Sequence, residues 1–141
     1  MIKKVKAIIN KDYPLISNLA NVSAILNELE DINWCGFYLV KEDALYLGPF
    51  QGDVACTKIP FNKGICGRCY REKKTIVIND VRKEIDHIAC SSLSRSEIVT
   101  PIIKDDNVVA LIDIDSPLLN RFHKSDQDTL EKIAKELSLL F

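Results

Sequence analysis

The chain has 141 residues, of which 47% are hydrophobic and 28% charged, so one globular domain with a sizeable core is expected over residues 1–141. Its 19 basic residues nearly balance its 20 acidic ones, and no basic cluster is interleaved with aromatic residues, which excludes nucleic acid and acidic membranes as expected partners. No apolar run is long enough for a signal-peptide core or a membrane span. We therefore expect a cytoplasmic protein that acts on a small molecule.

The predicted elements run from a helix through a series of strands to a second helix. Pro14 suits a first helical turn, and an apolar stripe follows it at Leu15, Leu19, Val22, Leu26 and Leu29. Short apolar, β-branched and aromatic segments predict six strands, over 34–40, 44–50, 55–59, 75–78, 97–103 and 108–115. Ser125 and Asp128 predict a capping box that opens the closing helix. Several strand connections are too short for a crossover helix, so the expected fold is α+β with a largely antiparallel sheet flanked by the two helices.

The loop between the last two predicted strands sets their register. Asn107 tolerates the left-handed conformation that a three-residue loop ending in a bulge requires, and this loop places Lys104 opposite Val108. A two-residue loop centred on Asp106 and Asn107 would shift the register and change the face on which the side chains lie.

The register of the longer loop gathers acidic residues on one face of this hairpin. It places Glu97 opposite Asp115 and Val99 opposite Asp113, so that three carboxyl groups converge at the open end. The other face then carries the isoleucines Ile98, Ile102, Ile112 and Ile114, and is expected to pack on the helices.

The first predicted strand also sorts into two faces. Trp34, Gly36 and Tyr38 share one of them, whereas Cys35 lies on the other with Phe37 and Leu39 and is expected in the core. Trp34 and Tyr38 fit a core as well as a binding site. The glycine between the two aromatic residues indicates free space and hence a pocket.

Four of the five cysteines fall in the middle of the chain, at Cys56, Cys66, Cys69 and Cys90. Without a sign of export, this density indicates catalysis, redox chemistry or a metal site instead of structural disulfides. One hypothesis is a zinc site, because Cys66-x-x-Cys69 and His87-x-x-Cys90 have the ligand types and spacing of half a LIM-type module. Against zinc, the residues after Cys66 resemble a helix, and a large core needs no metal to fold.

The redox hypothesis requires an accessible thiol, a second thiol that can reach it, and acid groups that handle a leaving oxygen. Cys90 is the candidate nucleophile because it lies in a polar loop just before the strand that carries Glu97. Mutual repulsion among the three acids is expected to keep at least one of them protonated near neutral pH. His87 is assigned no catalytic role.

Four segments, NWCGFYLV, LYLGPFQGDVACTKIPFNKGICG, HIACSSLSRSEIVTPI and ALIDIDSPLLNRF, resemble the free methionine-R-sulfoxide reductases, which are built on a GAF domain. The resemblance implies that Cys90 attacks the sulfur of free methionine-R-sulfoxide, releases methionine and becomes a sulfenic acid. Cys56 and Cys66 match the partner cysteines of the family, one of which would form a disulfide that thioredoxin reduces. It also implies a homodimer and no cofactor.

The same resemblance gives roles to the residues around the thiols. Trp34 and Tyr38 match an aromatic wall around the substrate, and the acids Glu97, Asp113 and Asp115 match residues that bind and activate it. Cys69 is not part of the family pattern, but its three-residue spacing from Cys66 on the predicted helix leaves it as a competing resolving thiol. Ser91 stands where an acid commonly follows the nucleophile. The alternative from another class is a GAF sensor that binds a small ligand without turnover, although we expect no output domain from the sequence.

Overall fold

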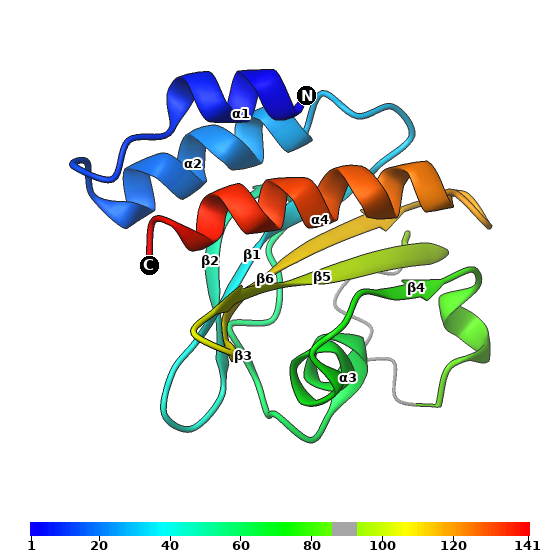
Figure 1. Cartoon of the computed structure of the whole chain (residues 1–141). Helices are drawn as coiled ribbons and strands as arrows, with labels where there is room; N and C mark the ends of the chain where they lie inside the picture. Colours follow the sequence, from blue (N-terminus) through cyan, green and yellow to red (C-terminus); the bar gives the residue numbers. More distant parts are fainter. Residues whose placement is uncertain (86–92) are drawn as a thin grey trace.

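The computed structural model describes residues 1–85 and 93–141, in which six strands form one sheet of order β3-β2-β1-β6-β5-β4 (Figure 1). In chain order the elements are α1 (Ile2–Ile8), α2 (Leu15–Leu26), β1 (Trp34–Val40), β2 (Leu45–Gly52), β3 (Lys58–Ile59), α3 (Gly64–Glu72), β4 (Ile76–Ile78), the short 3-10 helix η1 (Val81–Lys83), β5 (Ser96–Lys104), β6 (Asn107–Ser116) and α4 (Lys124–Ser138). Every pair of neighbouring strands is antiparallel. The predicted α+β fold is therefore confirmed. Within the described ranges no helix is long and apolar enough to cross a membrane.

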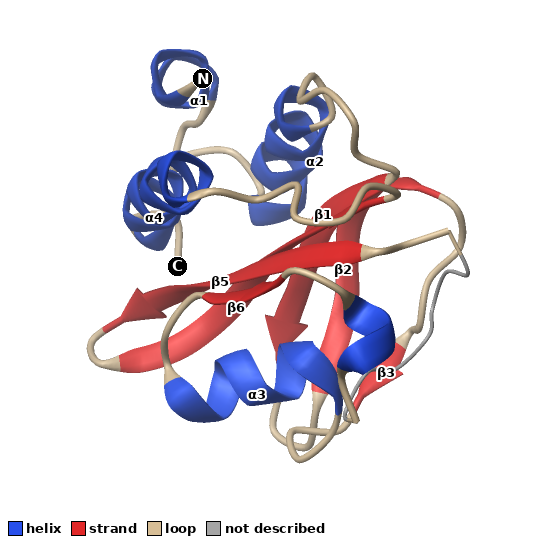
Figure 2. Ribbon diagram, turned by 90° about the vertical axis from the view of Figure 1, so that its right-hand side faces the viewer, coloured by secondary structure: helices blue, strands red, loops and turns tan. Residues whose placement is uncertain are grey.

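The sheet separates two layers of helix. Helices α1, α2 and α4 lie on one side and α3 lies on the other (Figure 2). The predicted isoleucine face of the hairpin packs in one buried cluster with residues of α2 and α4, among them Leu19, Val22, Ile133 and Leu137. Cys35 and Phe37 belong to the same cluster, as expected. The opposite face of the sheet, toward α3, is therefore the one on which the acidic and aromatic residues lie.

The helix ends differ from the prediction at two places. Helix α2 begins after Pro14 as predicted but ends at Leu26, so Leu29 packs against the core from the following loop. Helix α4 begins at Lys124, because the carboxylate of Asp126 accepts a hydrogen bond of 2.8 Å from the backbone N–H of His123. The capping box predicted from Ser125 and Asp128 is therefore wrong. Helix α1 was not predicted, and the strand predicted over 55–59 is reduced to Lys58–Ile59.

The loop between β5 and β6 is shorter than predicted, yet most of the register is as predicted. Asp105 and Asp106 have φ values of 51° and 66°, as in a two-residue hairpin loop with a left-handed residue at both central positions. Lys104 therefore pairs with Asn107, and the predicted three-residue loop is wrong.

A bulge then compensates for the missing loop residue. Ile103 pairs with Val108 but Ile102 pairs with Ala110, so β6 carries one extra residue at this point. From Ile102 onward the pairing is the predicted one, with Glu97 opposite Asp115 and Val99 opposite Asp113. The three carboxylates consequently share a face despite the error in the loop.

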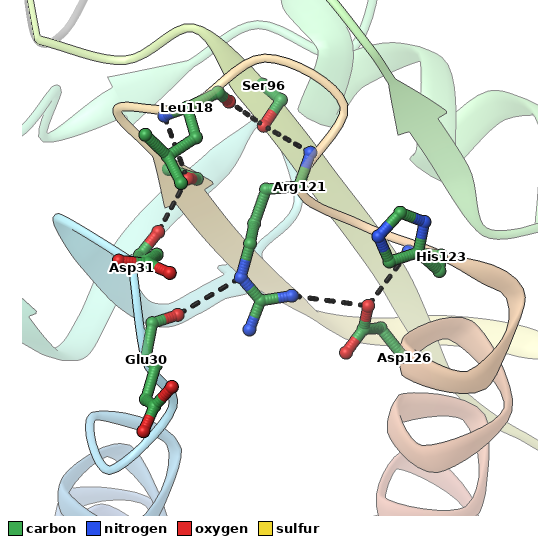
Figure 3. Close-up of polar contacts among 8 residues, drawn as sticks. Glu30, Asp31, Ser96, Leu118, Arg121, His123 and Asp126 are labelled. Atoms are coloured by element: carbon green, nitrogen blue, oxygen red, sulfur yellow. Dashed lines mark hydrogen bonds and ion pairs between the residues drawn. The ribbon is translucent and has the colours of Figure 1, made fainter.

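A polar network holds the open end of this hairpin against the helical layer (Figure 3). The Ser96 hydroxyl, which is fully buried, donates 2.6 Å to the carbonyl oxygen of Leu118, and the Ser116 hydroxyl donates to the carbonyl of Asp31. The Arg121 guanidinium bridges the carbonyl of Glu30 (3.1 Å) and the carboxylate of Asp126 (3.3 Å). Because Ser96 precedes Glu97, Ser116 follows Asp115 and the two serines pair with each other, the network fixes the backbone of both strands at one end of the acidic cluster.

Candidate active site

The carboxyl groups of Glu97, Asp113 and Asp115 form a buried cluster at the centre of the sheet, on the face toward α3. Glu97 and Asp113 are only 6% and 5% exposed, whereas Asp115 is partly exposed. Strand β1 adds its own residues to this cluster, because Trp34 pairs with Asp115 and Gly36 pairs with Asp113. Three strands, β1, β5 and β6, therefore build the site.

Burial dominates the electrostatics of the acidic cluster. It raises the pKa of Glu97 well above the ordinary value, and the charges of Asp113 and Asp115 raise it further. The pKa of Asp115 is also raised by burial first and by Asp113 second, but hydrogen bonds from Glu97 and Ser94 partly oppose that rise. Glu97 and Asp115 share a side-chain hydrogen bond, and the raised pKa of both acids favours a proton held by this pair, in line with the protonated acid expected from the sequence.

Two aromatic side chains of β1 lie beside the acids and are almost completely buried. Trp34 is 4% and Tyr38 2% exposed, and their rings are stacked with centroids 6.1 Å apart. The Phe50 ring of β2 stacks on the other side of Trp34 at 5.3 Å. The space predicted at Gly36 is not open, because a Cβ atom there would lie 2.3 Å from the Cβ of Phe50. Because Gly36 has no side chain, β2 approaches β1 closely at this point and its Phe50 extends the aromatic wall.

Cys66 and Cys69 both lie on α3, three residues apart, and both are buried thiols. The Cys66 thiol donates a hydrogen bond of 3.6 Å to the carboxylate of Asp113, and the Cys69 thiol donates one of 3.6 Å to the carbonyl of Val99. Burial, and then the charges of Asp113 and Glu97, raise the pKa of Cys66 well above that of an exposed thiol. Cys66 therefore contacts the acidic cluster, while Cys69 is directed into the sheet.

The other three cysteines lie in different parts of the chain. Cys35 is a fully buried thiol on the helical face, and burial raises its pKa to about 12. Cys56 is half-buried in the loop between β2 and β3 and is disulfide-bonded. The candidate nucleophile Cys90 lies outside the described residues, as do His87 and Ser91.

Among the described residues, one group of side chains has donor atoms close enough to share a cation. These atoms belong to Cys66, Glu97 and Asp113 and all lie within 4.8 Å of one another. The set differs from the zinc set considered from the sequence, of which only Cys66 and Cys69 are described. Cys69 points to Val99 and not to this group. The zinc hypothesis on the original four residues thus stays a prediction.

Sequence reasoning missed the contacts that join the aromatic wall to the loop containing Cys56. The Tyr38 hydroxyl donates a hydrogen bond of 2.9 Å to the carbonyl oxygen of Cys56. The Trp34 indole N–H donates one of 3.1 Å to the carbonyl oxygen of Asp53. Backbone carbonyls accept from any side chain that the fold brings near them, so residue types and spacing carry no signal for such bonds.

The sequence matches the model of the GAF domain over residues 21–141. The free methionine-R-sulfoxide reductase of Escherichia coli is 41% identical over 132 residues, which cover 93% of this chain and 80% of the relative. The solved free methionine-R-sulfoxide reductase of Neisseria meningitidis, in complex with its substrate, is 42% identical, with a TM-score of 0.94 over 99% of this chain and 85% of that one. The chain belongs to the GAF-domain family of free methionine-R-sulfoxide reductases. The resemblance inferred from the sequence motifs is thus confirmed.

The family also has relatives whose description carries no reductase activity. A putative GAF sensor protein from Burkholderia vietnamiensis is 36% identical, with a TM-score of 0.90 over 96% of this chain and 87% of that one. The fold therefore does not assign an activity by itself, and that assignment depends on the residues of the site.

Proposed function

We propose that the protein reduces free methionine-R-sulfoxide to methionine. The observation that carries the proposal is the buried cluster of Glu97, Asp113 and Asp115 beside the stacked rings of Trp34 and Tyr38. A sulfoxide is reduced when a thiolate attacks its sulfur while an acid protonates its oxygen, and a buried carboxyl group with a raised pKa supplies that proton. The names of the E. coli and N. meningitidis relatives support the same substrate.

In the proposed first step, the Cys90 thiolate attacks the sulfoxide sulfur and the S–O bond breaks. The oxygen takes a proton from the Glu97 and Asp115 pair and passes as a hydroxyl group to the Cys90 sulfur, and the transient bond between the two sulfur atoms breaks, so that methionine leaves and Cys90 becomes a sulfenic acid. Asp113 binds the substrate ammonium group, since an ionised carboxylate forms a charge-assisted hydrogen bond with it. Trp34 and Tyr38 contact the methyl and methylene groups, for which buried aromatic rings are suited.

In the proposed second step, a second thiol attacks the sulfenic sulfur, water leaves and a disulfide forms. Cys56 and Cys66 remain the candidates, and the half-buried, disulfide-bonded state of Cys56 favours Cys56. Cys66 is buried against Asp113 with a raised pKa, which makes its thiolate scarce and favours it less. A dithiol protein of the thioredoxin type then reduces the disulfide by exchange and is itself oxidised.

The decisive test uses reduced protein, free methionine-R-sulfoxide, thioredoxin and its NADPH-dependent reductase. We expect methionine release coupled to NADPH consumption, which Cys90→Ser abolishes. Cys56→Ser is expected to release one methionine per chain and then stop, whereas Cys69→Ala is expected to recycle normally. Full recycling by Cys56→Ser would move the resolving role to Cys66, and turnover by Cys90→Ser would refute the assigned nucleophile.

A small-molecule sensor is the second candidate, supported by the similarity to the Burkholderia protein. It would bind a ligand at the same residues without releasing methionine, so the assay above separates the two functions. The homodimer stays a prediction from the family resemblance. Light scattering on the purified protein would measure the mass directly.

A further inference from the structure

The loop that carries Cys56 is attached to the sheet at three backbone carbonyls. Trp34 donates to the carbonyl of Asp53 at 3.1 Å, Tyr38 donates to that of Cys56 at 2.9 Å, and the N–H of Leu47 donates to that of Thr57 at 2.9 Å. Two of these three donors are side chains that reach across from β1, the strand next to the acidic cluster. The conformation of the loop is therefore set from inside the site.

The aromatic donors are themselves fixed by their surroundings. Tyr38 is 2% exposed, and burial raises its pKa, so its hydroxyl keeps its proton and remains a donor. Trp34 is held between the rings of Tyr38 and Phe50. Gly52, with φ of 133°, begins the loop directly on Trp34, where a Cβ atom would lie 2.6 Å from the indole Cδ1.

We propose that Tyr38 is a positioning residue for the resolving thiol: its hydrogen bond to the Cys56 carbonyl holds the Cys56 thiol in place for attack on the sulfenic acid. Trp34 supports the same loop three residues earlier, through the carbonyl of Asp53. The inference rests on the proposed function, in which Cys56 resolves the sulfenic acid. It gives Tyr38 a second role, in the step after methionine has left, distinct from its contact with substrate.

The test measures how the sulfenic acid divides between two fates. Reduced protein is treated with one equivalent of free methionine-R-sulfoxide in the presence of a cyclic 1,3-diketone, which alkylates sulfenic acids. The ratio of alkylated protein to disulfide, read by mass spectrometry, depends on the rate of disulfide formation relative to trapping. It does not depend on how fast the sulfenic acid arose, so weaker substrate binding in a variant leaves the ratio unchanged.

For Tyr38→Phe we expect the ratio of trapped to disulfide product to rise by about twofold to tenfold, the range that one lost hydrogen bond produces. The matched control is Tyr46→Phe, which removes a hydroxyl that donates 3.0 Å to the exposed carboxylate of Asp43 and is expected to leave the ratio at the wild-type value. Trp34→Phe removes the bond to Asp53 and is expected to raise the ratio less than Tyr38→Phe does. An equal ratio in wild-type protein and Tyr38→Phe would overturn the inference.

A parallel series with hydrogen peroxide separates this inference from the proposed function. Peroxide oxidises a reactive thiolate to sulfenic acid directly, with water as the other product, so it needs no methionine sulfoxide. If wild-type protein releases no methionine but Tyr38→Phe still raises the ratio with peroxide, the proposed function fails and the positioning role stands. If Cys56→Ser forms the disulfide at the wild-type ratio, Cys56 is not the resolving thiol and the positioning role fails with it.

Discussion

Replacement of Glu97 by glutamine is expected to stabilise the protein while it removes the activity. Burial raises the pKa of Glu97, so the folded protein binds a proton that the unfolded chain releases above about pH 4.3. The contribution of this group to stability is therefore fully present below the unfolded pKa and is lost as the pH rises toward the folded pKa. Each proton by which the two states differ lowers the free energy of unfolding by about 1.4 kcal/mol per pH unit.

Glutamine keeps the size of the side chain and an N–H donor for Asp115, but it takes up no proton. The pH dependence of stability in Glu97→Gln should therefore be shallower than in wild-type protein by about one proton. The difference grows in favour of the variant as the pH rises from the unfolded pKa toward the raised folded pKa of Glu97. Glu97 is 6% exposed, so little of this effect is screened by solvent. The loss of the proton donor is expected to lower kcat/KM by about a hundredfold or more.

The assay is urea denaturation followed by fluorescence of the single tryptophan, repeated across the pH range for both proteins. The control is Glu42→Gln, at an exposed glutamate on the β1–β2 turn. A plot of its free energy of unfolding against pH should run parallel to that of the wild-type protein. Parallel lines for wild type and Glu97→Gln would refute the reasoning, because they would mean that Glu97 binds no proton on folding.

The other predictions concern packing, the polar network and thiol reactivity. Gly36→Ala should lower the free energy of unfolding by about 1–3 kcal/mol, and with it the melting temperature, because the added Cβ would lie 2.3 Å from the Cβ of Phe50. An unchanged melting temperature would contradict the packing described. Ser96→Ala should lower the free energy of unfolding, measured by urea denaturation, by about 1–3 kcal/mol, because it removes the donor to the Leu118 carbonyl. Ser138→Ala, at an exposed serine, should lower it much less. In the reduced protein at about pH 8, Cys66 should be alkylated at least about tenfold more slowly than in the unfolded chain, because burial keeps its thiol protonated. Peptide mass spectrometry would measure the two alkylation rates, and equal rates would exclude a buried thiol.

The acidic cluster was predictable from the sequence because strand periodicity constrains it strongly. Isoleucines alternate with aspartates in the second half of β6 and Ile98 follows Glu97 in β5, so only one register buries the apolar face, and a one-residue slip would expose it. That constraint explains why a wrong turn at Asn107 did not spoil the prediction: the bulge after Ile102 restores the register that burial requires. Local turn preference was the weaker of the two signals.

The rest of the site depends on contacts between distant segments, which the sequence does not encode locally. The contact of Cys66 with Asp113 follows from how α3 crosses the sheet, and the close approach at Gly36 follows from the partner strand. The glycine was interpreted as space for a ligand, but an antiparallel neighbour filled it. The placement of α4 was missed because two acids near its start compete for the cap, and Asp128 pairs with Lys124 instead.

The pairing of β1 with β6 has a consequence for the order in which the protein acquires its chemistry. The first strand of the chain lies beside the last one at the centre of the sheet, so Trp34 meets Asp115 only after all of the intervening sequence has been synthesised. Contacts between such distant segments form late and slow the folding of a small domain. On the ribosome, the nascent chain would thus expose its cysteines before any acid or aromatic wall surrounds them. Selective reactivity toward a sulfoxide is then a property that only the finished chain has.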